Sequence, residues 1–339
     1  MGDPHLISRT YLNLGAIRCA LGDLGAAAAD LQQALEISET TGDRPIQASA
    51  HCYLGIVDTE RNRFASARAH LELALETFRE VQDLSWEGDA LAALGRLALL
   101  QNDLAAAVEY LQAAHQRNKE SNELGYATTD LSYLAWTELA LGDEDAAWRK
   151  SLEAVQALEA GLQGVEHPQR IYYNYFLVAQ ATCHWGVART ALERAAESVE
   201  EHAACIDDPA LRESYLTGLR VNRAIVEAAA ELPPPGCLRV RLPRADVPPH
   251  RRPAPDETVG LVWTVDAGEQ DAALLKQEGK VAARRQRILR LCAEAEAAGA
   301  SPRADDLASA LQVTSRTVRT DLAALRRQGH AVCVRGRTD

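Results

Sequence analysis

A repeat of 40 residues, present four times in the first 154 residues, constrains the fold of this chain more than any other feature. In each copy a leucine is followed by a small residue, and an alanine lies twelve residues further on. The pairs are Leu14-Gly15, Leu54-Gly55, Leu94-Gly95 and Leu134-Ala135, and the alanines are Ala27, Ala67, Ala107 and Ala147. Self-similarity at this period is typical of stacked helical units, in which each unit buries the apolar face of its neighbour.

Each repeat predicts two helices joined by a tight turn. The turns contain Gly22, Asn62, Asn102 and Gly142, which are residue types that accept the left-handed backbone closing a helix. The small residues let the two helices of a unit approach closely, while the larger leucines fill the space between units. The repeat therefore predicts a continuous helical array.

These small-residue positions resemble those of the tetratricopeptide repeat. There are two departures, because the period is 40 residues rather than ~34 and the proline that often ends each repeat is missing. The resemblance implies an all-α fold, a tetratricopeptide α-solenoid of about five helix pairs plus a closing helix, over residues 5–231. The fifth pair is less regular, with helices at about 169–185 and around 188–195, and the closing helix runs from Asp208-Pro209 to about Ala230. The alternative is a plain α-helical bundle.

In a tetratricopeptide solenoid the first helix of each pair lines the concave groove, so the resemblance implies which side chains face a partner. The groove or partner-binding residues that it assigns are Arg9, Asp89, Arg96, Trp136 and Tyr173. Aromatic side chains beside arginines are typical of binding hot spots, which favours a protein or a small-molecule signal as the occupant. The alternative is that Trp136 and Tyr173 belong to the core between repeats.

The net charge of −12 is divided unevenly along the chain. Residues 1–235 contain 18 Lys and Arg against 35 Asp and Glu, a net charge of −17, whereas residues 236–339 contain 18 against 13, a net charge of +5. Because an acidic body repels a phosphate backbone, contact with nucleic acid is expected only in the C-terminal part.

A stretch rich in proline and arginine follows the repeats, at residues 232–268. The run Pro233-Pro234-Pro235-Gly236 ends helix, and two short pieces, 238–242 and 258–265, alternate like strands. One interpretation is a β-hairpin that docks on a neighbouring domain. The other is a semi-rigid linker with one transient strand.

Residues 305–336 have the pattern of a helix-turn-helix. Apolar residues at helical spacing predict two short helices, the second with Val318, Leu322 and Leu325 on its buried side. Thr314 is a good N-cap for this second helix, and Gly329 suits its C-terminal end. Residues 331–334 alternate like a short strand.

The stretch from Arg285 to Gly336 resembles the DeoR-type winged helix-turn-helix. The resemblance is carried by Ile288-Leu289, Asp306-Leu307-Ala308, Val313-Thr314, residues 317–322, Leu325, Gly329 and Val334-Arg335-Gly336. It implies a winged helix-turn-helix domain over residues 269–339 that binds double-stranded DNA through residues 280–339. The DNA-binding residues that it implies are Thr314, Ser315, Arg316, Thr317, Arg319, Thr320, Arg335 and Arg337. The chain departs from the family in a short wing and in Thr320, where a second basic residue is usual; Asp321 is expected to pair with an arginine.

Motifs that would indicate catalysis are missing. The chain has no phosphate-binding glycine loop, no nucleophile elbow and no Cys or His spacing typical of a metal site. We therefore expect no catalytic residues, no metal and no cofactor. The seven cysteines are odd in number and scattered, and neither a signal peptide nor an apolar run long enough for a membrane span is present. These features favour a cytoplasmic protein that is not an enzyme and has no membrane partner.

The order of these parts resembles the C-terminal half of bacterial multidomain signal-transduction ATPase (STAND, MalT-like) transcription regulators. The resemblance implies a transcription regulator whose solenoid is a sensor or protein-interaction module and whose winged helix reads DNA. It also allows an upstream or separate NTPase as a partner, and a homodimer. Two alternatives stay open: a scaffold or adaptor that does not bind DNA, and a regulatory fragment of such an NTPase.

Overall fold

The computed structural model describes residues 3–248 and 253–335, which fall into two units. The first unit is formed by Met1–Val178 with Ala191–Ala230. Its described residues form helices joined by turns and loops. The second unit consists of Ala179–Thr190 and Glu231–Asp339.

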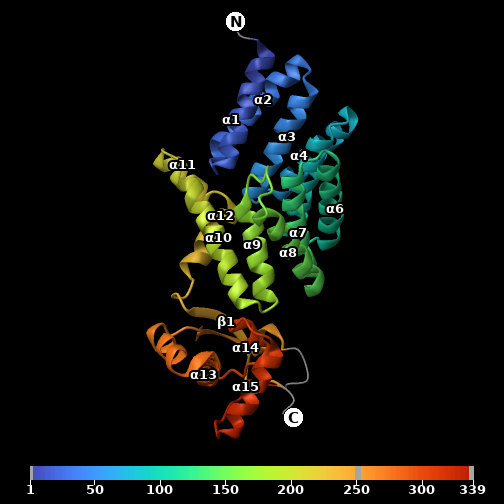
Figure 1. Ribbon diagram of the computed structural model, residues 1–339. Helices are drawn as coiled ribbons and strands as arrows, with labels where there is room; N and C mark the ends of the chain where they lie inside the picture. Colours follow the sequence, from blue (N-terminus) through green and yellow to red (C-terminus); the bar gives the residue numbers. More distant parts are fainter. Residues whose placement is uncertain (1–2, 249–252, 336–339) are drawn as a thin grey trace. The chain divides into compact units, whose positions relative to one another are not determined.

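The first unit consists of antiparallel helix pairs that stack in chain order (Figure 1). The pairs are α1 (Pro4–Ala20) with α2 (Leu24–Thr41), α3 (Arg44–Glu60) with α4 (Phe64–Val81), α5 (Leu84–Leu100) with α6 (Leu104–Glu120), α7 (Leu124–Leu141) with α8 (Glu144–Glu159), and α9 (Pro168–Ala181) with α10 (Trp185–Ala204). The end of α9 and the start of α10, residues 179–190, belong to the second unit. Two shorter helices, α11 (Pro209–Thr217) and α12 (Arg220–Ala230), complete the unit. The helical solenoid with five pairs that the repeat predicts is thus present among the described residues.

Helix starts and stops repeat every 20 residues, at half the period of the sequence repeat. Aspartates cap six of the first eight helices by accepting a hydrogen bond from a backbone amide, and the residue before most of these caps has positive φ. The capping aspartates are Asp3, Asp23, Asp43, Asp83, Asp103 and Asp143. This cap satisfies an amide that the first turn of a helix leaves free, so each turn both ends one helix and begins the next.

The small residues of the repeat hold the two helices of each pair together at close range. A Cβ added to Gly15, Gly55 or Gly95 would lie 2.6, 2.5 or 2.6 Å from the Cγ of a leucine on the second helix. These leucines are Leu31, Leu71 and Leu111, and all are fully buried. In the fourth pair Ala135 takes the place of the glycine and Ser151 takes the place of the leucine, and both are buried. The larger residue on the first helix is thus matched by a smaller residue on the second helix.

The end of the first unit differs from the expected single closing helix. The chain from Asp208 forms two helices, because it turns at Gly218. A Cβ on Gly218 would collide with the carbonyl oxygen of Gly22, so this point touches the turn between α1 and α2. Likewise α9 ends at Ala181, earlier than the expected end near residue 185.

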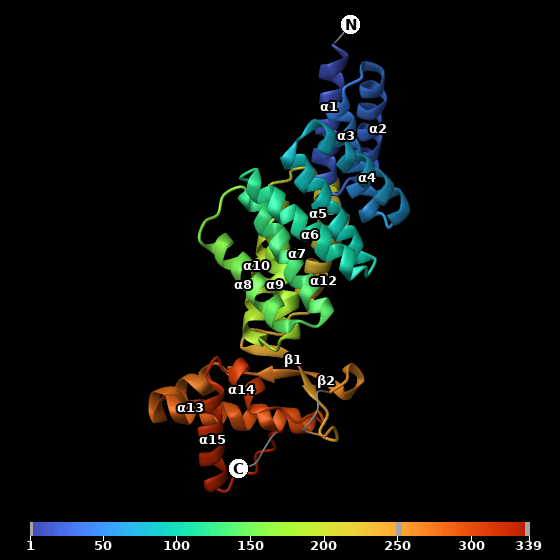
Figure 2. The same ribbon diagram turned by 90° about the vertical axis from the view of Figure 1, so that its right-hand side faces the viewer.

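The second unit joins a β-hairpin to three helices (Figure 2). Strands β1 (Cys237–Pro243) and β2 (Thr258–Thr264) pair antiparallel, with Val240 opposite Leu261. The short 3-10 helix η1 (Pro255–Glu257) precedes β2, and α13 (Glu269–Ala297), α14 (Ala304–Ala310) and α15 (Ser315–Arg327) follow it. Helix α13 is interrupted at Gly279, where φ is 85°.

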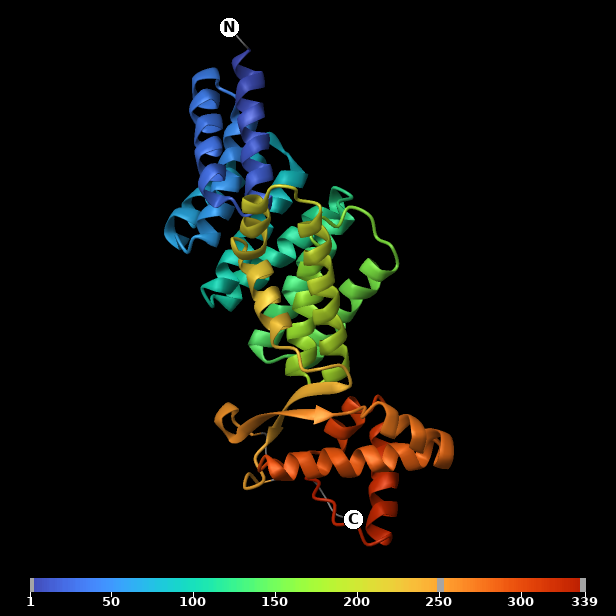
Figure 3. The same ribbon diagram turned by 90° about the vertical axis from the view of Figure 1, so that its left-hand side faces the viewer.

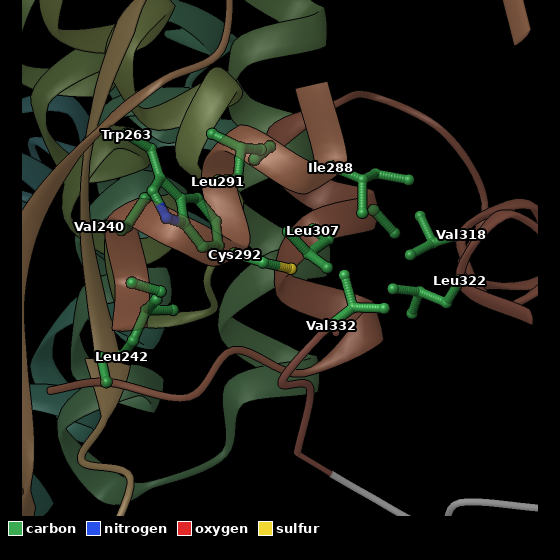
Figure 4. Close-up of a cluster of buried hydrophobic side chains, with 14 of the residues drawn as sticks. Val240, Leu242, Trp263, Ile288, Leu291, Cys292, Leu307, Val318, Leu322 and Val332 are labelled. Carbon is green, nitrogen blue, oxygen red and sulfur yellow. The ribbon is translucent and has the colours of Figure 1, made fainter. Parts of the chain in front are cut away.

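Hairpin and helices share one hydrophobic core. Trp263 and Val240 of the hairpin lie beside Leu291 and Cys292 of α13, and Leu307 of α14 faces Cys292 (Figure 4). Val318, Leu322 and Leu325 of α15 close the other side of this core. The alternation of residues 238–242 thus puts its apolar members into a core and leaves Arg239 and Arg241 exposed.

The prediction of a short strand at residues 331–334 is wrong. These residues have no ladder, and only Arg335 forms a bridge, with Arg303 before α14. Val332 is buried and Val334 packs on the core, so the alternation is real. The alternation does not produce a strand, because a strand must form a ladder of hydrogen bonds with a neighbouring strand. The segment beside residues 331–335 offers a single bridging residue, Arg303. Helices α14 and α15 form where the two short helices are expected, while residues 336–339, expected to form the wing tip, lie outside the described residues.

Candidate functional site

A pocket of about 260 Å³ lies in the first unit, between the first helices of successive pairs. Helices α3, α5, α7 and α9 each contribute to it, and α12, the yellow-orange helix of Figure 3, closes it. The repeat explains the first four contributions, because equivalent positions of successive units lie side by side in a solenoid. The contribution of α12 comes from outside the repeat.

Aromatic side chains form one wall of this pocket. Tyr133 and Trp136 lie on α7 with ring centroids 6.3 Å apart, and Tyr173 of α9 stacks near Phe176. Trp136 and Tyr173 are partly buried and both border the pocket. Trp136 also packs against a buried cluster of α5, α6 and α7, and the ring of Tyr173 contacts that of the buried Phe176.

Three arginines border the same pocket: Arg96, Arg170 and Arg220. Arg220 is anchored, since its guanidinium donates to the carbonyl of Thr59 and to Asn62, at 3.2 and 2.8 Å. Arg96 and Arg170 form no ion pair with any described residue; the guanidinium of Arg96 lies 5.8 Å from the ring centroid of Tyr133. The Nε atom of Arg170 is buried and has no hydrogen-bond partner among the described residues. A buried donor without a partner costs free energy, so this arrangement favours an added acceptor.

A second pocket of about 160 Å³ adjoins the first, sharing Ile56, Glu60, Arg96 and Arg170 with it. Its remaining wall is largely apolar and aromatic but contains three acidic residues, Asp89, Asp130 and Glu166. The two pockets together are here called the groove site, and Arg96 and Arg170 border both.

Burial controls the ionisation of the groove site. Burial raises the pKa of Asp89 to about 7, although the charge of Arg96 opposes the shift. Burial likewise raises the pKa of Asp130 to about 8, against a hydrogen bond of 2.7 Å from Asn118. The charge of Arg170, followed by burial, lowers the pKa of His167 to about 2, which keeps this imidazole neutral. Near neutral pH the two aspartates are therefore partly protonated.

Four of the five residues assigned to the groove border this site. Arg96, Trp136 and Tyr173 line the larger pocket, and Asp89 lines the smaller one. Arg9 is exposed on α1 and lines neither. Sequence reasoning missed Arg170, Arg220 and Glu166, because they come from α9, α12 and the loop before α9, where the 40-residue register is lost.

The second unit places most of the expected DNA-binding residues on the outer side of α15. Thr314 caps the helix by accepting a hydrogen bond from the amide of Thr317 at 3.2 Å. Arg316, Arg319 and Thr320 are exposed, and Arg319 lies 3.5 Å from the exposed carboxylate of Asp305. Ser315 and Thr317 are partly buried in the first turn.

The structure does not place Arg335 on the surface with the other expected DNA-binding residues. Its side chain is buried, and its guanidinium donates to the carbonyl oxygen of Pro248. The backbone amide of Arg335 also donates to Pro302, at 2.7 Å. These contacts hold the guanidinium inside the unit, away from any phosphate. Arg337 lies outside the described residues.

Asp321 pairs with arginines, as expected. It is 2 % exposed and accepts from Arg284 and Arg285 of α13 at 2.6 and 2.9 Å. These pairs fix the inner side of α15 against α13, so that the side with Arg316 faces solvent.

Comparison with known proteins supports the repeat part of this description. The family model of the tetratricopeptide repeat matches residues 6–80. A solved structure titled "Crystal Structure of Rap Protein Complexed with Competence and Sporulation Factor" matches with a TM-score of 0.51 and 16% sequence identity, over 68% of this chain and 67% of that one. The search of curated proteins gives no match. The chain thus contains a tetratricopeptide-type helical solenoid.

Two further searches concern the described residues alone. In residues 3–248 and 253–335 no helix is long and apolar enough to cross a membrane. The same residues contain no group of three or more His, Cys, Asp or Glu side chains placed to hold a metal ion.

Proposed function

We propose that the solenoid is an interaction module that binds a short peptide segment, free or part of a partner protein, in the groove site. The observation that carries this proposal is the combination of an aromatic wall with Arg96 and Arg170, two arginines that lack an ion-pair partner among the described residues. Tyr, Trp and Arg are the residue types that dominate binding energy at interfaces. The tetratricopeptide match and the likeness to the Rap protein, whose title names a bound factor, support it.

The test uses the full chain and pools of synthetic peptides. The protein is incubated with random tetrapeptides, separated from unbound peptide by size exclusion, and the retained peptides are identified by mass spectrometry. The variant Trp136→Ala with Arg96→Ala is expected to retain about tenfold less peptide than the wild type, because it removes one wall and one charge of the site. Arg9→Ala is the matched control, since Arg9 is exposed outside the site. Unchanged retention by the folded double variant would refute the proposal.

We propose as a second function that α15 reads duplex DNA, which makes the whole protein a ligand-responsive transcription regulator. The specific observation is the exposed, capped N-terminal part of α15 with Arg316 and Arg319, in a part of the chain whose net charge is positive. A helix of this kind contacts base edges with its first turns, and its arginines suit guanine or phosphate. Without this second function the protein is a tetratricopeptide scaffold or adaptor.

Duplex binding is measured by selection from random DNA with sequencing, and by titration at several salt concentrations. Wild type should show a sequence preference and an affinity that falls steeply with salt, because phosphate contacts release counterions. Arg316→Ala with Arg319→Ala should abolish the preference while leaving the fold intact. Arg68→Ala with Arg194→Ala, two arginines of the solenoid, is the control. Equal binding by wild type and the α15 double variant would leave the scaffold as the better function.

A further inference from the structure

The two pockets of the groove site differ in their acidic side chains. Three of these, Asp89, Asp130 and Glu166, line the smaller pocket alone, and both pockets share Glu60. Arg96 and Arg170 line both pockets, and Arg220 lines the larger one alone. A ligand in the smaller pocket therefore meets carboxylates together with the two shared guanidinium groups.

The carboxylate of Asp89 has no partner at hydrogen-bonding distance among the described residues. Its carboxylate forms no hydrogen bond or ion pair with any other residue in 3–248 or 253–335, although it lies in the pocket wall. Its neighbour Asp130 is different, because it is 2 % exposed and already accepts a hydrogen bond from Asn118. Asp89 is thus a partly buried carboxylate that a ligand can reach, whereas Glu166 of the same pocket is exposed to solvent.

Spacing along α5 sets a length for the ligand. Asp89 and Arg96 are seven residues apart on this helix, both within the groove site. Seven residues of α-helix rise about 10 Å, and an extended peptide covers about 3.3 to 3.6 Å per residue. A cationic group and an anionic group about three residues apart on an extended peptide therefore match the two side chains.

We propose that the groove site binds the amino-terminal end of a peptide, with the free α-ammonium group against Asp89 and a carboxylate at about the third or fourth residue against Arg96 and Arg170. This inference rests on the proposed function of the solenoid as a peptide-binding module. Burial raises the pKa of Asp89 against the opposing charge of Arg96, and an ammonium group in direct contact supplies a further positive charge. The buried Nε of Arg170 gains an acceptor in the same complex.

The experiment compares two pools of random tetrapeptides that differ only at the amino terminus, one with a free amine and one N-acetylated. Full-length wild type should retain the free-amine pool about tenfold better, as expected for the loss of one charged hydrogen bond. Both pools carry a carboxy-terminal amide, so the retained peptides should be enriched in Asp or Glu at the third or fourth position. Asp89→Asn keeps the shape of the side chain and should abolish the preference for the free amine, while Arg170→Gln should abolish the acidic enrichment. Asp145→Asn, an exposed carboxylate on α8 outside both pockets, is the control.

The possible outcomes separate this inference from the proposed function. Retention of neither pool by wild type would overturn peptide binding itself. Equal retention of the two pools would overturn the ammonium site and leave peptide binding in place. Retention governed by lysine content in both pools would assign the acidic end to a side-chain ammonium and also overturn the inference. A preserved preference in folded Asp89→Asn would do the same.

Discussion

The paired charges below the surface of the second unit differ from the charges of the groove site. In the second unit Asp321 is held by Arg284 and Arg285, and Asp271 by Arg287 and Arg290, with nitrogen–oxygen distances of 2.6 to 2.9 Å. In the solenoid Asp89 has no such partner in the described residues, nor have Arg96 and Arg170. Charges that are paired at short range fix elements to one another. Charges left without partners in a pocket are available to a ligand.

The pKa values show the same contrast. A hydrogen bond from Arg290, the largest cause, lowers the pKa of Asp271 to about 2. Burial raises the pKa of Asp89 to about 7 and that of Asp130 to about 8. The difference arises because an adjacent guanidinium favours the carboxylate, whereas burial without one favours the neutral acid.

The largest effect on stability is expected at Asp321. Asp321→Ala leaves two arginines of α13 without their carboxylate, so the free energy of local unfolding should fall by about 3 kcal/mol, the cost of breaking a buried pair. Hydrogen-exchange mass spectrometry of peptides from α13 and α15 measures this unit separately from the solenoid. Asp305→Ala, which removes an exposed carboxylate 3.5 Å from Arg319, should change the exchange little. Similar exchange in both variants would show that the paired aspartate does not hold α15 in place.

The periodic part of the fold could be predicted from residues alone, because its causes are local. Gly15, Gly55 and Gly95 are required by the leucines opposite them, and the aspartate caps mark each helix start. Asp89, Arg96, Trp136 and Tyr173, which the tetratricopeptide resemblance assigns to the groove, each border at least one of the two pockets.

The remaining part depends on contacts between distant segments, which no local pattern contains. Arg170 and Arg220 join the groove site only because α9 and α12 return to the solenoid outside the repeat register. The burial of Arg335 depends on Pro248, which is 87 residues away in the chain. The prediction of a strand at 331–334 failed for the same reason. Alternation shows which side chains are buried and which are exposed, but it does not show whether a neighbouring strand is present.

The response to pH should also differ between the units. The folded pKa of Asp130 is raised, so its folded state binds more protons than the unfolded state between about pH 4 and pH 8, and the solenoid should lose stability as pH rises through this window. The folded pKa of Asp271 is lowered, so its stabilisation is present above its ordinary pKa of 3.8 and is lost as pH falls toward about 2.

Urea denaturation followed by circular dichroism, which is dominated by the many solenoid helices, tests the first half of this statement. Between about pH 7 and pH 8, above the ordinary pKa of histidine, the free energy of unfolding of wild type should decline, and Asp130→Asn should flatten the decline because it removes one of the titrating groups. Hydrogen exchange of α13 peptides in acid, compared between wild type and Asp271→Asn, tests the second half. A parallel response of both units would contradict the difference in charge pairing.

The smallest effect on stability is expected at Arg170. Arg170→Gln removes a guanidinium that has no ion-pair partner among the described residues, so the free energy of unfolding should change by no more than about 0.5 kcal/mol, in either direction. The same substitution at Arg285, which donates to Asp321 at 2.9 Å, should cost about 1 to 2 kcal/mol. Measured side by side by denaturation and hydrogen exchange, the two variants separate an arginine that holds the fold from one kept for a ligand. A large loss of stability in Arg170→Gln would mean that this arginine supports the solenoid, and would remove it from the groove site.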